Sequence, residues 1–123
     1  NASVIAVQEV DLEHVSSYGI ISVEDINFEK FTLITDIIEK PQIEVSPSRL
    51  AVVGRYVLDS EIFKILSGLS AGVGGEIQLT DAILALIKNG KKVMAYRAES
   101  QFLDTGTPEG WMIANRVVAE TKI

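Results

Sequence analysis

The sequence contains no cysteine and only one histidine, His14. The absence of cysteine excludes disulfide bonds, thiolate zinc sites, iron–sulfur clusters and a cysteine nucleophile. A single histidine excludes a metal site that is built from several histidines. Long apolar runs are also absent, because the longest one covers only residues 82–87, whereas a membrane-spanning helix needs about 20 apolar residues. We therefore expect no membrane span.

Positive charge is scarce as well. The 123 residues include 11 Lys and Arg against 17 Asp and Glu, which gives a formal net charge of −6. Because nucleic-acid-binding modules normally carry a basic face, this charge argues against nucleic acid as a partner. No charged start followed by an apolar stretch indicates a signal peptide, so we expect a soluble, cytoplasmic protein.

The length suits one domain that buries its own core. The chain nevertheless begins at Asn1, without an initiator methionine, and enters an apolar, strand-like run at residues 4–7. Natural domains often begin with a polar segment instead. We interpret this start as a cut inside a larger protein.

Apolar patterning predicts both strands and helices. Runs of β-branched and apolar residues predict strands at residues 3–10, 19–23, 31–39, 50–58 and 92–98. Apolar residues at helical spacing predict helices capped by Ser60, across residues 79–87, and after Thr107-Pro108-Glu109. In the last helix the residues expected to face the core are Trp111, Ala114, Val117 and Val118. Strands that alternate with helices indicate an α/β fold with a mixed sheet.

The tripeptide Glu39-Lys40-Pro41 follows a predicted strand. Ligands of open α/β sheets bind beyond the carboxyl ends of strands, where a lysine can neutralise phosphate and a carboxylate can accept hydrogen bonds from sugar hydroxyls. Neighbouring residues on a strand point to opposite faces. Glu39 and Lys40 can therefore share one site only if the strand ends or twists sharply at residue 39. The alternative is a pair of solvated charges.

Two other segments could carry chemistry. Asp104-Thr105-Gly106-Thr107 lies between a predicted strand and a predicted helix, where the carboxylate could ligate Mg²⁺ or merely order the turn. The glycine-rich residues 72–76 could cradle phosphate through their backbone, but they follow no strand and lack the Lys-Ser/Thr of a P-loop. A connector between two helices explains them better. His14 lies in a polar turn, and with Ser16 and Ser17 it makes no catalytic triad.

Four segments together resemble the second half of bacterial UTP–glucose-1-phosphate uridylyltransferases, from about residue 4 to about residue 118. They are Tyr18-Gly19, Ile38-Glu39-Lys40-Pro41, SPSRLAVVGRYVL at residues 46–58, and GEIQLTDAI at residues 75–83. The wider family is the sugar-nucleotide pyrophosphorylases. The resemblance implies a partial Rossmann-like nucleotidyltransferase fold, with a mixed β-sheet flanked by helices.

The resemblance also implies site residues. Gly19 would approach the sugar with its backbone, and Glu39 would accept hydrogen bonds from glucose hydroxyls. Lys40 would hold the sugar phosphate, which makes Lys40 and Asp104 the catalytic candidates. The remaining carried-over residues are Val52 and Gly54, which would line the sugar pocket, Thr80, which would lie near it, and Asp104, which would be a Mg²⁺ ligand.

The implied reaction joins UTP and glucose 1-phosphate into UDP-glucose and pyrophosphate, with Mg²⁺ as cofactor. Residues 1–123 would form the C-terminal, sugar-phosphate-binding part of the domain, and the N-terminal nucleotide-binding part with its glycine-rich loop is absent from the sequence. Relatives of this kind associate, so a homo-oligomer is expected. Two alternatives stay open: a glucose-1-phosphate thymidylyltransferase, indicated by the Asp104-Thr105-Gly106-Thr107 turn, and a non-catalytic sugar-phosphate-binding module.

Overall fold

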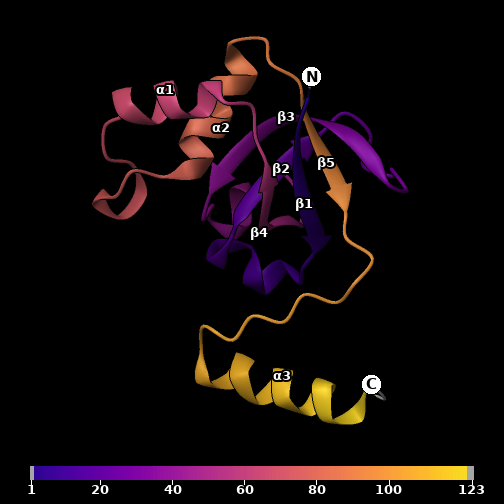
Figure 1. The fold of residues 1–123 in the computed structure, drawn as a ribbon. Coiled ribbons are helices and arrows are strands. Elements are labelled where there is room, and N and C mark those ends of the chain that lie inside the picture. The colour runs from indigo at the N-terminus through magenta and orange to yellow at the C-terminus, as the bar shows by residue number, and fades with distance from the viewer. Residues whose placement is uncertain (1, 122–123) are drawn as a thin grey trace.

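The computed structural model describes residues 2–121 of the chain. The described elements, in chain order, are β1 Ser3–Glu9, β2 Gly19–Val23, β3 Phe31–Glu39, β4 Leu50–Val57, α1 Glu61–Gly68, α2 Leu79–Lys88, β5 Val93–Arg97 and α3 Pro108–Glu120 (Figure 1). Short 3₁₀ turns lie between them at Leu12–Ser17, Ile43–Val45 and Val73–Gly75. The predicted strands and helices are confirmed, with ends that differ by one or two residues.

The five strands form a mixed sheet in the pairing order β4-β1-β5-β3-β2. The β1–β5 pair is parallel, and the other pairs are antiparallel. One further register pair, Ile20 with Ala51, joins β2 to β4, so the sheet curls strongly. The predicted mixed sheet is therefore confirmed.

The helices α1 and α2 cover one side of the strands (Figure 1), where α2 packs on β3 and α1 packs on α2. The apolar stripe predicted for α2 is real, since Ala82, Ile83 and Leu86 are fully buried. They join Ile5 and Val7 of β1 in the main core cluster. Burying one large aliphatic side chain contributes about 1.5–3 kcal/mol, so this stripe fixes α2, and the residues at its start, against the sheet.

The predicted cap of α1 is wrong. Ser60 already has helical dihedral angles, with φ −61° and ψ −19°, and its side chain makes no capping hydrogen bond. Asp59 takes this role, because its Oδ1 accepts a hydrogen bond from the N–H of Glu61 at 2.9 Å. A capping residue needs an extended backbone to turn its side chain toward the first free N–H groups, and Ser60 lacks that conformation.

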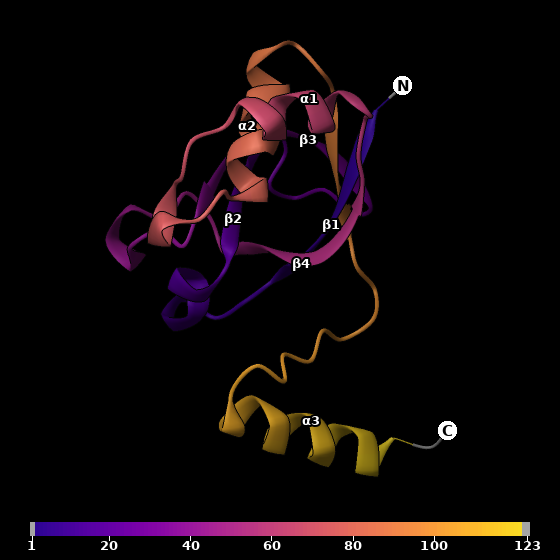
Figure 2. The same cartoon turned by 60° about the vertical axis from the view of Figure 1, so that its left-hand side comes forward.

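Helix α3 begins as predicted but does not face the core as predicted. The Thr107 hydroxyl accepts a hydrogen bond from a backbone N–H of the first turn, which confirms the cap. Ala114 is buried, but Trp111 and Val118 are 59% and 52% exposed. Figures 1 and 2 both show α3 set apart, at the end of the molecule opposite α1 and α2. Of the face that the apolar spacing identified, Ala114 is therefore buried and Val117 half-buried, while Trp111 and Val118 are exposed.

None of the helices within residues 2–121 combines the length and apolar character that crossing a membrane requires.

Candidate functional site

Glu39 and Lys40 lie where β3 ends and a turn begins. β3 ends at Glu39, and Lys40 has a positive φ of 46°, a conformation that few residues other than glycine adopt. The backbone N–H of Lys40 donates a hydrogen bond to the carbonyl oxygen of Tyr18 at 2.9 Å. The condition set by the sequence, that the strand must end or twist at residue 39, is therefore confirmed.

Four of the expected site residues meet at this end of the sheet. Gly19 of β2 pairs with Glu39 of β3, and the hydroxyl of Thr80 in α2 donates to Glu39 Oε2 at 2.9 Å. A Cβ atom built on Gly19 would lie 2.9 Å from Thr80 Cγ2, 3.4 Å from Glu39 Oε2 and 3.8 Å from Val52 Cγ2. Gly19 and Thr80 are buried, and Glu39 is partly exposed. The cluster thus holds a carboxylate in a fixed direction with one side open to solvent.

Tyr56 belongs to this region although the sequence did not single it out. Burial raises the pKa of its hydroxyl above the ordinary value of 10.0, and the charge of Glu39 raises the pKa further. The phenol therefore stays protonated and remains a hydrogen-bond donor. Tyr56 stands inside the motif at residues 46–58, so the motif contained it, but nothing in the sequence connected it with Glu39.

Gly54 lies in an irregular part of β4. Val52 pairs with Val7 and Tyr56 pairs with Ile5, so three residues of β4 stand opposite a single residue of β1. Gly54 has a φ of +81°, and no described atom lies within 4 Å of the position that its Cβ would take. A glycine is suited to such a bulge. Its expected place in a sugar pocket stays a prediction.

Asp104 lies on the segment between β5 and α3 and is joined to the sheet through Tyr18. Its Oδ2 accepts a hydrogen bond from the Tyr18 hydroxyl at 3.0 Å, and its Oδ1 accepts one from the N–H of Gly106 at 2.9 Å. Burial raises the pKa of Tyr18, and the hydrogen bond and charge of Asp104 raise it further. Tyr18 directly precedes Gly19 of β2, so this hydrogen bond links the Asp104 loop to the start of the strand that pairs with Glu39.

The surroundings of Asp104 fit a magnesium ligand. Its carboxylate is exposed, and each of its oxygen atoms keeps a lone pair beyond its hydrogen bond. Mg²⁺ is commonly held by one or two carboxylates, together with water and phosphate oxygens. Asp104 also lines a cleft of about 650 Å³ with Tyr18, Glu9 and Glu109, where acidic side chains favour a cation.

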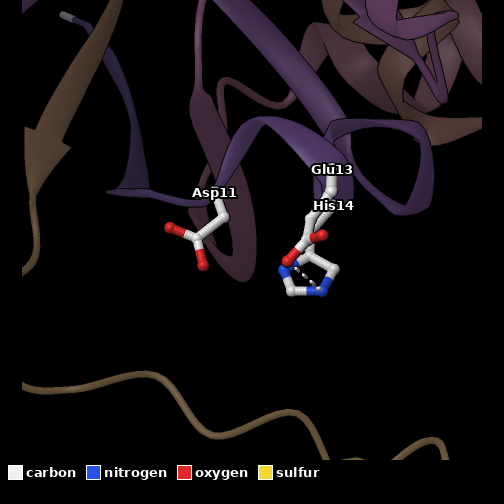
Figure 3. A group of neighbouring side chains, drawn as sticks. All are labelled: Asp11, Glu13 and His14. Carbon is white, nitrogen blue, oxygen red and sulfur yellow. Dashed lines mark ion pairs between the residues drawn. The ribbon is translucent and has the colours of Figure 1, made fainter.

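A second group of acidic side chains lies on the 3₁₀ turn that follows β1. Figure 3 shows Asp11, Glu13 and His14, whose ligand atoms lie within 4.8 Å of one another and which are all exposed. The His14 Nε2 atom is 3.9 Å from Glu13 Oε1. Exposed acidic groups are common without a metal, so proximity alone assigns no ligand to them. The hydroxyl of Ser16, which the sequence analysis considered with His14, donates to the carbonyl of Pro41 at 2.8 Å.

The glycine-rich loop connects α1 to α2, as expected. Gly74 and Gly75 have φ values of +74° and +75°. The N–H of Gly72 donates to the carbonyl of Glu76 at 2.7 Å, and the N–H of Gly75 donates to the carbonyl of Gly72 at 3.0 Å. These two backbone donors are therefore used within the loop, which favours a connector over a phosphate cradle.

Comparison with known proteins identifies the family of this chain. The family model described as "Nucleotidyl transferase" matches residues 1–121. A UTP–glucose-1-phosphate uridylyltransferase from Pseudomonas aeruginosa is 40% identical over 96% of this chain and 42% of its own length. One from Mycoplasma genitalium is 41% identical over 97% of this chain and 41% of its own length.

Solved structures show the same relationship. A UDP-glucose pyrophosphorylase complexed with UDP-glucose has a TM-score of 0.90 and 40% identity, over 98% of this chain and 45% of the other. A putative glucose-1-phosphate thymidylyltransferase from Bacillus anthracis has a TM-score of 0.74 and 25% identity, over 98% of this chain and 45% of the other. The chain thus spans less than half the length of these relatives. Because the family model matches nearly the whole chain, the chain belongs to the nucleotidyl transferase family.

Proposed function

We propose that this chain carries the sugar-phosphate-binding part of a UTP–glucose-1-phosphate uridylyltransferase. The observation that carries the proposal is the cluster at the end of β3, where Thr80 orients the Glu39 carboxylate at 2.9 Å and Lys40 follows in a turn with positive φ. A carboxylate beside a lysine suits a molecule that has both sugar hydroxyls and a phosphate. The similarity to curated uridylyltransferases at about 40% identity supports this choice.

In the proposed reaction, a phosphate oxygen of glucose 1-phosphate attacks the α-phosphorus of UTP, and pyrophosphate leaves. The attacking oxygen is already an anion, so no histidine or cysteine base is needed. Positioning and charge neutralisation supply most of the catalysis in such reactions. Lys40 neutralises the sugar phosphate, Glu39 accepts hydrogen bonds from the glucose hydroxyls, and Gly19 leaves room for the ring. Val52 and Gly54 would line the same pocket.

Asp104 would hold Mg²⁺ in this enzyme. The metal would offset the negative charge of the reacting phosphates and orient them. The chain's own contribution is to present one exposed carboxylate, ordered by hydrogen bonds from Gly106 and from Tyr18.

Catalysis further requires the nucleotide-binding part that the longer relatives have beyond the matched segment. We propose that residues 1–123 supply only the sugar-phosphate-binding part of the domain, in a cytoplasmic, homo-oligomeric enzyme. The exposed apolar residues of α3, which include Trp111, Met112 and Val118, support contact between this helix and a further polypeptide segment. The covering segment would be either the nucleotide-binding part or a second copy of the chain.

A glucose-1-phosphate thymidylyltransferase is the second candidate. The turn Asp104-Thr105-Gly106-Thr107 and the structural similarity to a putative enzyme of that class favour it. Both candidates share the sugar phosphate and the reaction type, and they differ in the nucleotide. A third possibility, a non-catalytic sugar-phosphate-binding module, would retain sugar-phosphate binding and lack turnover in any context.

The test is a fusion of this chain to the nucleotide-binding part of a uridylyltransferase relative, assayed for UDP-glucose formation with UTP and separately with dTTP. We expect turnover with UTP, none from the chain alone, and a loss of about 100-fold for Lys40→Ala and for Asp104→Ala, as for other residues that stabilise transition-state charge. Lys92→Ala, at an exposed lysine next to β5, is the matched control. An inactive fusion that still binds glucose 1-phosphate would favour the non-catalytic module.

A further inference from the structure

Tyr18 joins two segments of the site that lie far apart in the sequence. Its carbonyl oxygen accepts a hydrogen bond from the N–H of Lys40 at 2.9 Å. Its hydroxyl donates to Asp104 Oδ2 at 3.0 Å, across 86 residues of sequence. One residue therefore contacts both the turn that would bind the sugar phosphate and the carboxylate that would bind the metal.

Among the described residues, the Asp104 carboxylate accepts hydrogen bonds from Tyr18 and from Gly106 of its own loop. After β5 the chain runs as an extended segment to α3, which stands apart from the sheet (Figures 1 and 2). The amide of Gln8 in β1 holds the middle of this segment, because it donates to the carbonyl of Ser100 at 3.0 Å and accepts from the N–H of Phe102 at 2.8 Å. The Tyr18 ring meets the Phe102 ring edge-on at 6.3 Å.

These contacts stop just before Asp104, so the Tyr18 hydroxyl is the link that ties the carboxylate itself to the sheet. Gly106 also bonds to Asp104, but it belongs to the same loop and moves with it. Without the hydroxyl, the Asp104 carboxylate would keep only its hydrogen bond from Gly106 and would be free to rotate relative to Tyr18.

We propose that Tyr18 is a positioning residue that holds the Asp104 carboxylate at a fixed place relative to the Lys40 turn. The inference rests on the proposed function, in which Asp104 binds Mg²⁺ and Lys40 binds the sugar phosphate. Groups that hydrogen-bond to metal ligands fix the direction of those ligands, and removing them commonly weakens metal affinity about 10- to 100-fold. The same loss is expected when the Tyr18 hydroxyl is removed.

The test compares Tyr18→Phe with Tyr96→Phe in the 123-residue chain by nuclear magnetic resonance. Tyr18→Phe removes the hydroxyl and keeps the ring against Phe102. Tyr96→Phe is the same change in a ring that packs on Phe31 at 5.3 Å. Hydrogen exchange is read at the Gly106 amide and at amides in β2 and β3, and Mg²⁺ is titrated while the Gly106 signal is followed.

In Tyr18→Phe we expect faster exchange at Gly106, unchanged exchange in β2 and β3, and a Mg²⁺ midpoint raised by about 10- to 100-fold. Tyr96→Phe should change none of these. Unchanged exchange at Gly106 would overturn the proposal, and so would faster exchange across the whole sheet, which indicates a general loss of stability. If Mg²⁺ leaves the Gly106 signal of the unaltered chain unmoved, the metal assignment of the proposed function fails, and the exchange of Gly106 still decides the role of Tyr18.

Discussion

Replacing Gly19 with alanine places a methyl group inside the proposed site. The new Cβ would lie 2.9 Å from Thr80 Cγ2, closer than real Cβ contacts allow, and 3.4 Å from Glu39 Oε2. Gly19 does not have a positive φ, so alanine adds no backbone strain and the penalty is steric. Thr80 is only 5% exposed and is held by the helix that covers the sheet, so it cannot move aside freely.

The expected loss of stability follows from these contacts. Forcing an extra methyl group into a packed site costs about 1–3 kcal/mol. Alanine in a strand recovers about 0.5–1 kcal/mol relative to glycine. A net loss of about 1–2 kcal/mol is therefore expected, which would be measured as a lower midpoint in urea unfolding. Gly68→Ala is the matched control, because nothing lies within 4 Å of that Cβ position.

A double-mutant cycle shows whether Thr80 causes the loss. Thr80→Ser removes Cγ2 and keeps the hydroxyl that bonds to Glu39. Gly19→Ala should therefore be less damaging in the Thr80→Ser background, with a coupling free energy of about 0.5–3 kcal/mol. Equal losses in the two backgrounds would refute the steric reasoning. A Gly19→Ala variant as stable as the unaltered chain would refute the close packing itself.

Further predictions concern a hydrogen bond, a helix cap and a phenol. Thr80→Val keeps the side-chain shape but removes the donor to Glu39, so the free energy of unfolding should fall by about 1 kcal/mol. An unchanged urea midpoint would show that the hydrogen bond between Thr80 and Glu39 does not stabilise the fold. Asp59→Ala removes the acceptor at the start of α1 and should cost about 0.5–2 kcal/mol in thermal unfolding, whereas an unchanged Tm would exclude the capping role. Burial and the charge of Glu39 raise the pKa of Tyr56. The stability from its neutral phenol is then present below the ordinary value of 10.0 and lost as pH rises through the raised pKa. Tyr56→Phe should reduce this loss of stability at alkaline pH, measured by urea unfolding. If the stability of the variant depends on pH in the same way as that of the unaltered chain, Tyr56 is not the source of the loss.

The strands and the turn at Lys40 could be predicted from local sequence. β2 and β3 begin and end where the β-branched runs do, because a strand's apolar pattern is set by its own residues. The alternation of side chains along a strand also set the condition that β3 must end by Glu39. The structure meets that condition.

The remaining features depend on contacts that no local pattern contains. The bond between Tyr18 and Asp104 spans 86 residues, so neither residue carries a local signal of it. The residue type alone does not decide whether Asp59 or Ser60 caps α1, because the choice depends on backbone conformation, and Ser60 is already helical. The apolar spacing of α3 predicted a buried face but could not show what covers it, and Trp111 remains 59% exposed.

The most direct test of the proposed site is a titration of the chain with glucose 1-phosphate, followed through the backbone amide signals of Gly19 and Lys40. We expect both signals to shift and saturate, Lys40→Ala to lose the effect, and glucose without phosphate to bind more weakly. If the two signals stay in place while glucose 1-phosphate moves others, or if Lys40→Ala binds it equally well, the sugar phosphate is not held at the end of β3.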